Sequence, residues 1–139
     1  MALKYLLDTN ILSEPVRKTP DAKVVRHIQE AADEIAIAAT TWHELLFGVF
    51  RMPDSRRRTA LEQYLLDTIP PEIPILPYDA QAAAWFAQER ARLSKTGLPP
   101  SYPDGQIAAV AAANDLILVT RNVSDFVEFS DLKIENWFE

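Results

Sequence analysis

Short apolar runs recur along the chain, and each is followed by polar residues or by a helical pattern. They lie at Leu3–Leu7, Glu34–Ala39, Ile73–Leu76 and Leu116–Val119. Their apolar residues are consecutive and not alternating, which is typical of strands covered on both faces in a parallel sheet. A further segment, Leu132–Trp137, is predicted to add a short edge strand. The pattern therefore predicts a mainly parallel sheet.

Helical patterns separate these runs. After Thr40-Thr41, apolar residues recur at helical spacing through Trp42, Leu45, Leu46, Val49 and Phe50. Earlier in the chain, Thr19-Pro20-Asp21 is typical of a helix start, with Thr19 as the N-cap, and that helix is expected to run to about Ala32. The stretch around Glu14-Pro15, before this helix, is expected to be irregular.

Three more helices follow from the same signals. Asp54-Ser55 is expected to cap one helix and Asp79 another, while Pro70-Pro71 is expected to begin a linker between them. Ile107–Ala113 is almost wholly apolar and mostly alanine, which indicates a helix packed closely on the sheet. Strands alternating with helices predict one three-layer α/β/α domain over residues 1–139.

Composition narrows the functional classes. A net charge of −6 argues against a protein that holds nucleic acid by bulk positive charge. The absence of cysteine excludes disulfides and thiolate metal sites, and it fits a reducing, cytoplasmic compartment. The first apolar run is too short for a signal peptide or a membrane span, so no membrane association is expected. With only three glycines, the chain has no glycine-rich nucleotide loop.

Four acidic residues from separate segments are predicted to meet at one edge of the sheet. Asp8 and Asp125 follow strands, Glu44 is expected in the first turn of the helix after the second strand, and Asp104 is expected to begin the helix before the last interior strand. All four positions lie at the carboxyl edge of a parallel sheet, where such folds build their sites. Clustered carboxylates with no cysteine ligand favour Mg²⁺ or Mn²⁺, and such ions activate water and polarise phosphodiesters.

Each acid also has a structural explanation. Asp8 and Asp125 could be turn residues, Asp104 could be an N-cap, and Glu44 could form a capping box with Thr41. Four caps need not share one edge, however, which favours a joint role.

Two other functions stay open from the residues alone. One is a phosphoryl-handling enzyme with Asp8 as nucleophile, as in the haloacid dehalogenase superfamily, although that group requires a second aspartate where this chain has Asn10. The other is a non-catalytic module whose acidic cleft receives a basic peptide. Only a measurement of activity separates these from a metal-dependent hydrolase.

Four ordered motifs resemble the PIN-domain ribonucleases, in particular the VapC toxins of VapBC toxin-antitoxin modules. The motifs are LLDTNIL at residues 6–12, TWHELLFG at 41–48, PDGQIAA at 103–109 and TRNVSDF at 120–126. The resemblance covers essentially the whole chain. It implies a PIN-like α/β/α fold, Mg²⁺ or Mn²⁺ dependence, cleavage of RNA by metal-activated water, a homodimer, and a VapB-type antitoxin whose tail enters the acidic cleft.

The resemblance also implies roles for particular residues. The acidic quartet of the family falls on Asp8, Glu44, Asp104 and Asp125, of which Asp8, Asp104 and Asp125 are the expected metal ligands. Its polar helpers fall on Asn10, Thr120 and Asn122. The basic residues Arg56, Arg57, Arg58 and Arg121 are candidate contacts for RNA phosphates or an antitoxin, although a run of arginines is also typical of a solvated helix face.

Overall fold

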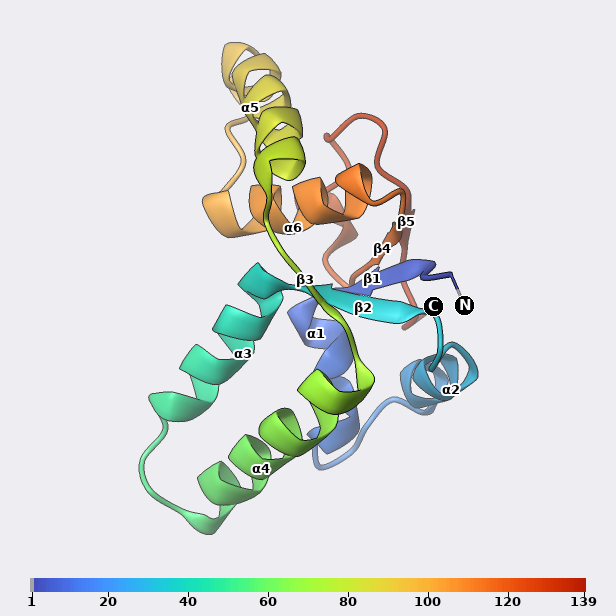
Figure 1. Ribbon diagram of the computed structural model, residues 1–139, viewed down its shortest axis with the longest axis vertical. Helices are drawn as coiled ribbons and strands as arrows, with labels where there is room; N and C mark the ends of the chain where they lie inside the picture. Colours follow the sequence, from blue (N-terminus) through green and yellow to red (C-terminus); the bar gives the residue numbers. More distant parts are fainter. Residues whose placement is uncertain (1) are drawn as a thin grey trace.

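A five-stranded parallel sheet forms the centre of the protein (Figure 1). The computed structural model describes residues 2–139. Strand β1 (Tyr5–Leu7) lies between β2 (Ile35–Ala38) and β4 (Ile117–Val119), and β3 (Ile75–Leu76) and β5 (Ile134–Glu135) form the two edges. All four pairings are parallel. The predicted parallel sheet and its C-terminal edge strand are therefore confirmed.

Helices cover both faces of the sheet. One face carries α5 (Ala80–Lys95) and α6 (Tyr102–Ala113). The other carries α1 (Thr9–Leu12), α2 (Ala22–Glu30), α3 (Ala39–Phe50) and α4 (Arg56–Glu72), as Figure 1 shows. Two short 3₁₀ turns, η1 (Glu14–Val16) and η2 (Val123–Asp125), complete the described elements. The expected three-layer α/β/α architecture is present.

The strands are apolar at consecutive positions because each face of the sheet has its own core. Leu6 and Leu118 pack toward α5 and α6, whereas Leu7 and Val119 pack toward α1–α4. All four side chains are fully buried. Burial on both faces explains why the strands show no polar alternation.

Several predicted element boundaries were wrong. Helix α2 is capped by Asp21, whose carboxylate accepts from the backbone of Lys23 and Val24, and not by Thr19. The stretch around Glu14-Pro15 is not irregular, since the 3₁₀ turn η1 occupies it, and the short helix α1 precedes it. At the start of α2, Thr19 and Asp21 are both residues that favour a cap, and only Asp21 makes the capping hydrogen bonds.

The two prolines at 70 and 71 do not begin a linker. They lie in the last turn of α4, which continues to Glu72. The helix persists there because Ile69 and Ile73 are both buried and the Ile73 N–H donates to the Ile69 carbonyl at 2.7 Å. Tertiary burial thus outweighs the helix-breaking tendency of proline.

Helix α6 also begins earlier than predicted. Its N-cap is Ser101, whose side chain accepts from the backbone N–H of Asp104, so Asp104 lies in the first turn and does not cap the helix. Helix α6 packs closely on α5 through Gly105, because a Cβ at this position would overlap the ring of Phe86. Because Asp104 directly precedes Gly105, this close packing of α6 on α5 also sets the position of Asp104.

A buried acid holds the loop after η2 against α5. Glu89 is only 6% exposed, and it accepts from Arg92 at 2.9 Å and from the backbone N–H of Ser130 at 2.6 Å. Arg92 also donates to the carbonyl of Glu128. Within residues 2–139, no helix has the length and apolar character needed to cross a membrane.

Candidate active site

The four predicted acids come from four different segments at the carboxyl edge of the sheet. Asp8 directly follows β1, and its backbone N–H donates to the carbonyl of Val119 at 2.9 Å, which ties it to the end of β4. Glu44 lies in α3, the helix that leaves β2. Asp104 lies at the start of α6 and Asp125 at the end of η2.

Asp8 is the buried member of this group. Its side chain accepts from the Thr9 backbone N–H at 2.8 Å and from the Thr120 hydroxyl at 2.9 Å. Asp8 is 7% exposed and Thr120 is fully buried. Two donors therefore fix the Asp8 carboxylate from opposite sides, one on α1 and one at the end of β4.

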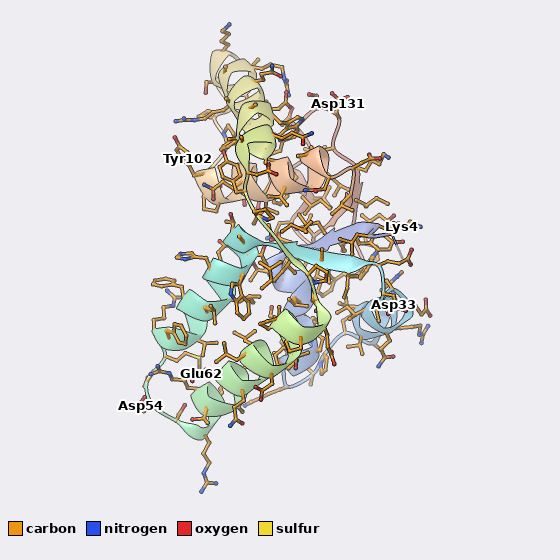
Figure 2. The ribbon with its side chains drawn as sticks, in the orientation of Figure 1. Lys4, Asp33, Asp54, Glu62, Tyr102 and Asp131 are labelled. Atoms are coloured by element: carbon orange, nitrogen blue, oxygen red, sulfur yellow. The ribbon has the colours of Figure 1, made fainter. Side chains whose placement is uncertain are left out.

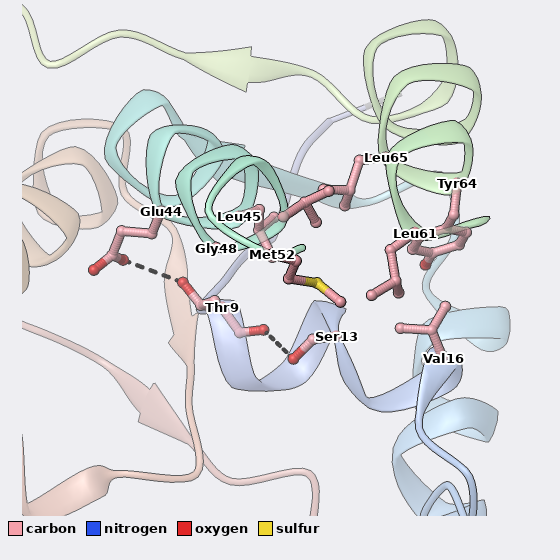
Figure 3. A pocket seen from close by; sticks show the side chains of 11 residues that line it. Thr9, Ser13, Val16, Glu44, Leu45, Gly48, Met52, Leu61, Tyr64 and Leu65 are labelled. Atoms are coloured by element: carbon pink, nitrogen blue, oxygen red, sulfur yellow. Dashed lines mark hydrogen bonds between the residues drawn. The ribbon is translucent and has the colours of Figure 1, made fainter. Parts of the chain in front are cut away.

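Glu44 is held by Thr9, which donates its hydroxyl to the Glu44 carboxylate at 3.2 Å (Figure 3). Because α3 begins at Ala39, Glu44 falls in the second turn and not in the first turn as predicted. The alternative capping box with Thr41 is not formed, since Thr41 is fully buried and its hydroxyl has no hydrogen-bond partner among the described residues.

Mutual repulsion and burial raise the pKa values of three of the acids. For Asp8, burial is the largest cause of the raised pKa, and the charges of Asp104 and Asp125 add to it, against the lowering effect of its hydrogen bonds. Burial likewise raises the pKa of Glu44, with contributions from Asp8 and Asp104. The pKa of Asp104 is raised by burial and by Asp125. The pKa of each of these three acids is thus raised in part by the charge of at least one other acid of the group.

None of the four acids is paired in a salt bridge among the described residues. Within residues 2–139, none of the four carboxylates lies within salt-bridge distance of lysine, arginine or histidine. Carboxylates that repel one another without a partner favour a bound divalent cation. The group therefore has the charge and the all-oxygen donor chemistry that suit Mg²⁺ or Mn²⁺.

The four acids have the chemistry of an ion site, but their side chains are not yet positioned as one. No three or more acidic, histidine or cysteine side chains in the described part of the chain are already arranged to hold one ion. Asp8 is fixed by its hydrogen bonds, whereas Asp125 is exposed and Asp104 is partly exposed. Binding an ion at this edge therefore requires some of these side chains to change position.

The predicted polar helpers differ in what they contact. Thr120 bonds Asp8, and its hydroxyl also accepts from the backbone N–H of Asn122 at 3.0 Å. Asn10 bonds no carboxylate; its side-chain oxygen accepts from the backbone N–H of Arg121 at 3.1 Å. Asn10 thus connects α1 to the loop after β4.

Within residues 2–139, none of the predicted arginines forms a salt bridge with the four acids. Arg58 donates to Asp54 at 2.9 Å and to the Met52 carbonyl, at the far end of the α3–α4 hairpin. The Arg121 guanidinium lies over the ring of Phe138, 4.4 Å from its centroid. Arg57 lines a shallow basic hollow with Arg17, Lys18 and Thr19.

An apolar groove opens beside Glu44. It runs between α1 and the α3–α4 hairpin, with Val16, Leu45, Leu61 and Leu65 among its lining residues (Figure 3). Thr9 and Glu44 lie at one end of the groove, so it is continuous with the acidic site. We refer to it below as the apolar groove.

Sequence reasoning missed Thr9 and Ser101. Thr9 touches both Asp8 and Glu44, and Ser101 caps the helix that carries Asp104. The position of Thr9 between Asp8 and Asn10 was the available signal for the first. The polar residue before Tyr102-Pro103 was the signal for the second, because proline is common in the first turn of a helix.

A parallel α/β/α sandwich with carboxylates gathered at one sheet edge defines a class of acidic-site domains, and comparison with known proteins identifies the family. The PIN-domain family model matches residues 5–131. The chain therefore belongs to the PIN-domain family.

Curated relatives within this family are named as toxins and ribonucleases. Toxin FitB of Neisseria gonorrhoeae is 34% identical over 87% of this chain and 89% of its own length. VapC ribonuclease Y4jK of Sinorhizobium fredii is 34% identical, covering 96% and 97%. The tRNA(fMet)-specific endonuclease VapC of Shigella flexneri is 32% identical, covering 97% and 98%.

Solved structures agree with these relatives. The crystal structure of FitAcB from Neisseria gonorrhoeae matches with a TM-score of 0.89 and 32% identity, over 97% of this chain and 99% of that one. VapBC-5 from Mycobacterium tuberculosis, a member of the VapBC family of toxin-antitoxin systems, matches with a TM-score of 0.70 and 26% identity, over 97% and 96%. The predicted PIN-like fold and the VapC resemblance are both confirmed.

Proposed function

We propose that this protein is a metal-dependent endoribonuclease and the toxin of a type II toxin-antitoxin pair. The observation that carries the proposal is the set of four acids at one sheet edge, where burial and neighbouring carboxylates raise the pKa values of Asp8, Glu44 and Asp104 and none of the four forms a salt bridge within residues 2–139. The naming of the PIN-domain relatives as ribonucleases supports RNA as the substrate.

In this proposal Asp8, Asp104 and Asp125 hold a Mg²⁺ or Mn²⁺ ion. When bound, such an ion supplies positive charge that polarises the phosphodiester and favours attack by water. Thr120 keeps the Asp8 carboxylate in one orientation through its 2.9 Å hydrogen bond. Asn122 steadies Thr120 in turn, and Asn10 orders the loop that carries both.

Glu44 is the candidate general base. Burial and its acidic neighbours raise its pKa, which makes the carboxylate a better proton acceptor. The Thr9 hydroxyl orients the group. Glu44 accepts a proton from the attacking water, and the water oxygen bonds to phosphorus. The bond from phosphorus to the ribose 3′ oxygen breaks, and that oxygen takes up a proton from solvent. The products are a 5′-phosphate and a 3′-hydroxyl.

The partner in this proposal is a VapB-type antitoxin. The apolar groove supports it, because an apolar peptide segment could lie there and place a basic residue beside Glu44. Membership of VapBC-5 in a family of toxin-antitoxin systems is consistent with such a pair. We include a homodimer in the proposal, to be tested by sedimentation of the purified protein.

The decisive experiment is cleavage of a cellular RNA pool by the antitoxin-free protein, with Mg²⁺ or Mn²⁺ and with EDTA. Initiator tRNA belongs in the pool because the Shigella flexneri relative is named for it. The variant Asp104→Asn should lose the activity. Asp115→Asn is the matched control, since Asp115 is exposed and lies before β4 instead of after it.

The ends of the fragments test the chemistry separately. A 5′-phosphate agrees with attack by water, whereas a 2′,3′-cyclic phosphate would contradict the mechanism. If folded protein with added metal leaves all RNA intact, the nuclease proposal fails, and binding of a basic peptide to the acidic edge is the next property to measure.

A further inference from the structure

A second hollow, of about 460 Å³, adjoins the acidic site. Helix α3 contributes His43, Glu44 and Phe47 to its lining, Arg51 at the C-cap of α3 adds to them, and the start of α6 contributes Tyr102 and Gln106. Glu44 is therefore shared between the acidic site and this hollow. We call it the α3–α6 hollow.

Two aromatic rings of the α3–α6 hollow are exposed to solvent, which is unusual for side chains of this size. Phe47 is 56% exposed and Tyr102 is 55% exposed. In Figure 2 the Tyr102 side chain projects outward at the start of α6. Neither ring contributes its full area to the core, so both are available to a ligand.

Each exposed ring has a guanidinium over it. Arg51 lies 5.3 Å from the Phe47 ring centroid, and Arg90 lies 4.5 Å from that of Tyr102 and donates to its hydroxyl at 2.7 Å. His43 is parallel to Phe47, with the ring centroids 6.2 Å apart. Within residues 2–139, neither arginine is in a salt bridge. Since Arg51 also lines the hollow, its charge is free to meet an anion there.

A polar group lies between the rings and the acids. The side-chain oxygen of Gln106 accepts from the Thr40 hydroxyl at 2.9 Å, so its amide nitrogen keeps both hydrogens for a ligand. An exposed aromatic face, a nearby cation and an amide donor are the groups that bind nucleotides of single-stranded nucleic acid.

We infer that the α3–α6 hollow binds one nucleotide of single-stranded RNA next to the scissile phosphate, with its base against Phe47 and its phosphate near Arg51. The inference rests on the proposed ribonuclease function and adds the residues that hold the substrate. It also explains how a chain of net charge −6 admits a polyanion beside four carboxylates, since Arg51 gives the hollow a local positive charge.

A second copy of the chain is the competing occupant, because exposed aromatic residues also mark protein interfaces. The nucleotide is favoured since the surface is hollowed, carries the Arg51 guanidinium over an exposed ring and includes Glu44 of the acidic site.

The test compares Phe47→Ala with Phe50→Ala in the full-length protein. Both phenylalanines are about half exposed on α3, but only Phe47 lines the hollow. We expect Phe47→Ala to lower kcat/KM for single-stranded RNA by about tenfold, the effect of losing one stacked base, while Phe50→Ala stays near wild type. Phe47→Tyr, which keeps the ring, should restore the rate.

Binding is measured separately in the Asp104→Asn background, with a labelled single-stranded oligoribonucleotide and fluorescence anisotropy. Phe47→Ala should weaken the affinity by a similar factor, and Arg51→Ala should lower the slope of log affinity against log salt by about one. This assay requires no cleavage. A stacking site with no nuclease activity would therefore be seen, and failure of the two proposals can be told apart.

Two results would overturn the inference. One is cleavage and binding by Phe47→Ala that equal those of Phe50→Ala while the wild type cleaves RNA. The other is a change in sedimentation of Phe47→Ala from dimer to monomer with unchanged RNA affinity, which would assign the α3–α6 hollow to contact between copies.

Discussion

Replacing Gly105 by alanine tests how the fold positions the catalytic edge. An added Cβ would overlap the ring of Phe86, which is 2% exposed and cannot swing into solvent. Alanine gains about 1 kcal/mol over glycine in a helix interior. Overpacking a core costs about 1–3 kcal/mol, and here it acts on a confined ring, so the upper end applies. We expect a net destabilisation of about 2 kcal/mol.

For a domain of this size, that loss lowers Tm by about 6–8 °C. Helix α6 must also move away from α5, which displaces Asp104 and lowers the rate of RNA cleavage. Thermal unfolding followed by circular dichroism measures the first effect, and initial cleavage rates measure the second. Both should appear in the same variant.

The matched control is Gly48→Ala, in the interior of α3. No atom lies within 4 Å of a Cβ at this position, so only the gain in helix propensity acts and Tm should rise by about 2–4 °C. A Gly105→Ala protein that melts at or above wild type would refute the packing argument. In a Phe86→Leu background the Gly105→Ala change should cost less, because the smaller side chain relieves the overlap.

Three further changes have defined outcomes. Asp104→Asn should raise the Tm of the metal-free protein at pH 7. The folded pKa of Asp104 lies above its ordinary 3.8, so ionisation of Asp104 destabilises the fold as pH rises. The gain in Tm should therefore vanish at pH 3, where the carboxyl group is protonated. Thr120→Val should lower the rate of cleavage by about 10- to 100-fold. It should also move the acidic limb of the pH–rate profile to higher pH, because the hydrogen bond that lowers the pKa of Asp8 is lost. An unshifted profile would contradict this. Glu89→Gln should cost about 2 kcal/mol in urea unfolding at pH 7. Because the Arg92 hydrogen bond lowers the pKa of Glu89, that difference should shrink below pH 4.5, with cleavage unchanged.

The sheet and its acidic edge could be predicted because burial on both faces leaves a strong pattern. Strands such as Leu116–Val119 have to be apolar throughout. An acid at the carboxyl end of such a strand, such as Asp8 after the first strand, is therefore easy to recognise. The order of the strands then requires such acids to share an edge. These features depend on chain connectivity and not on fine packing.

The ends of the helices, and the hydrogen bonds that hold the acids in place, could not be predicted in the same way. Ser101 and Asp104 are both good caps in isolation, and only the fold selects Ser101. Prolines at 70 and 71 usually end a helix, but burial of Ile69 keeps this one intact. The bond from Thr9 to Glu44 joins residues 35 positions apart, and no local pattern encodes it.

The acids are supplied by segments from nearly the whole length of the chain, and this has a consequence for synthesis. The hydrogen bond from Thr120 to Asp8 spans 112 positions, and β4 pairs directly with β1. A growing polypeptide on the ribosome lacks β4 until most of the domain has emerged. A partly translated chain therefore has no assembled acidic edge. If the complete domain is a toxin, the cell making it is exposed to activity only after synthesis is nearly finished.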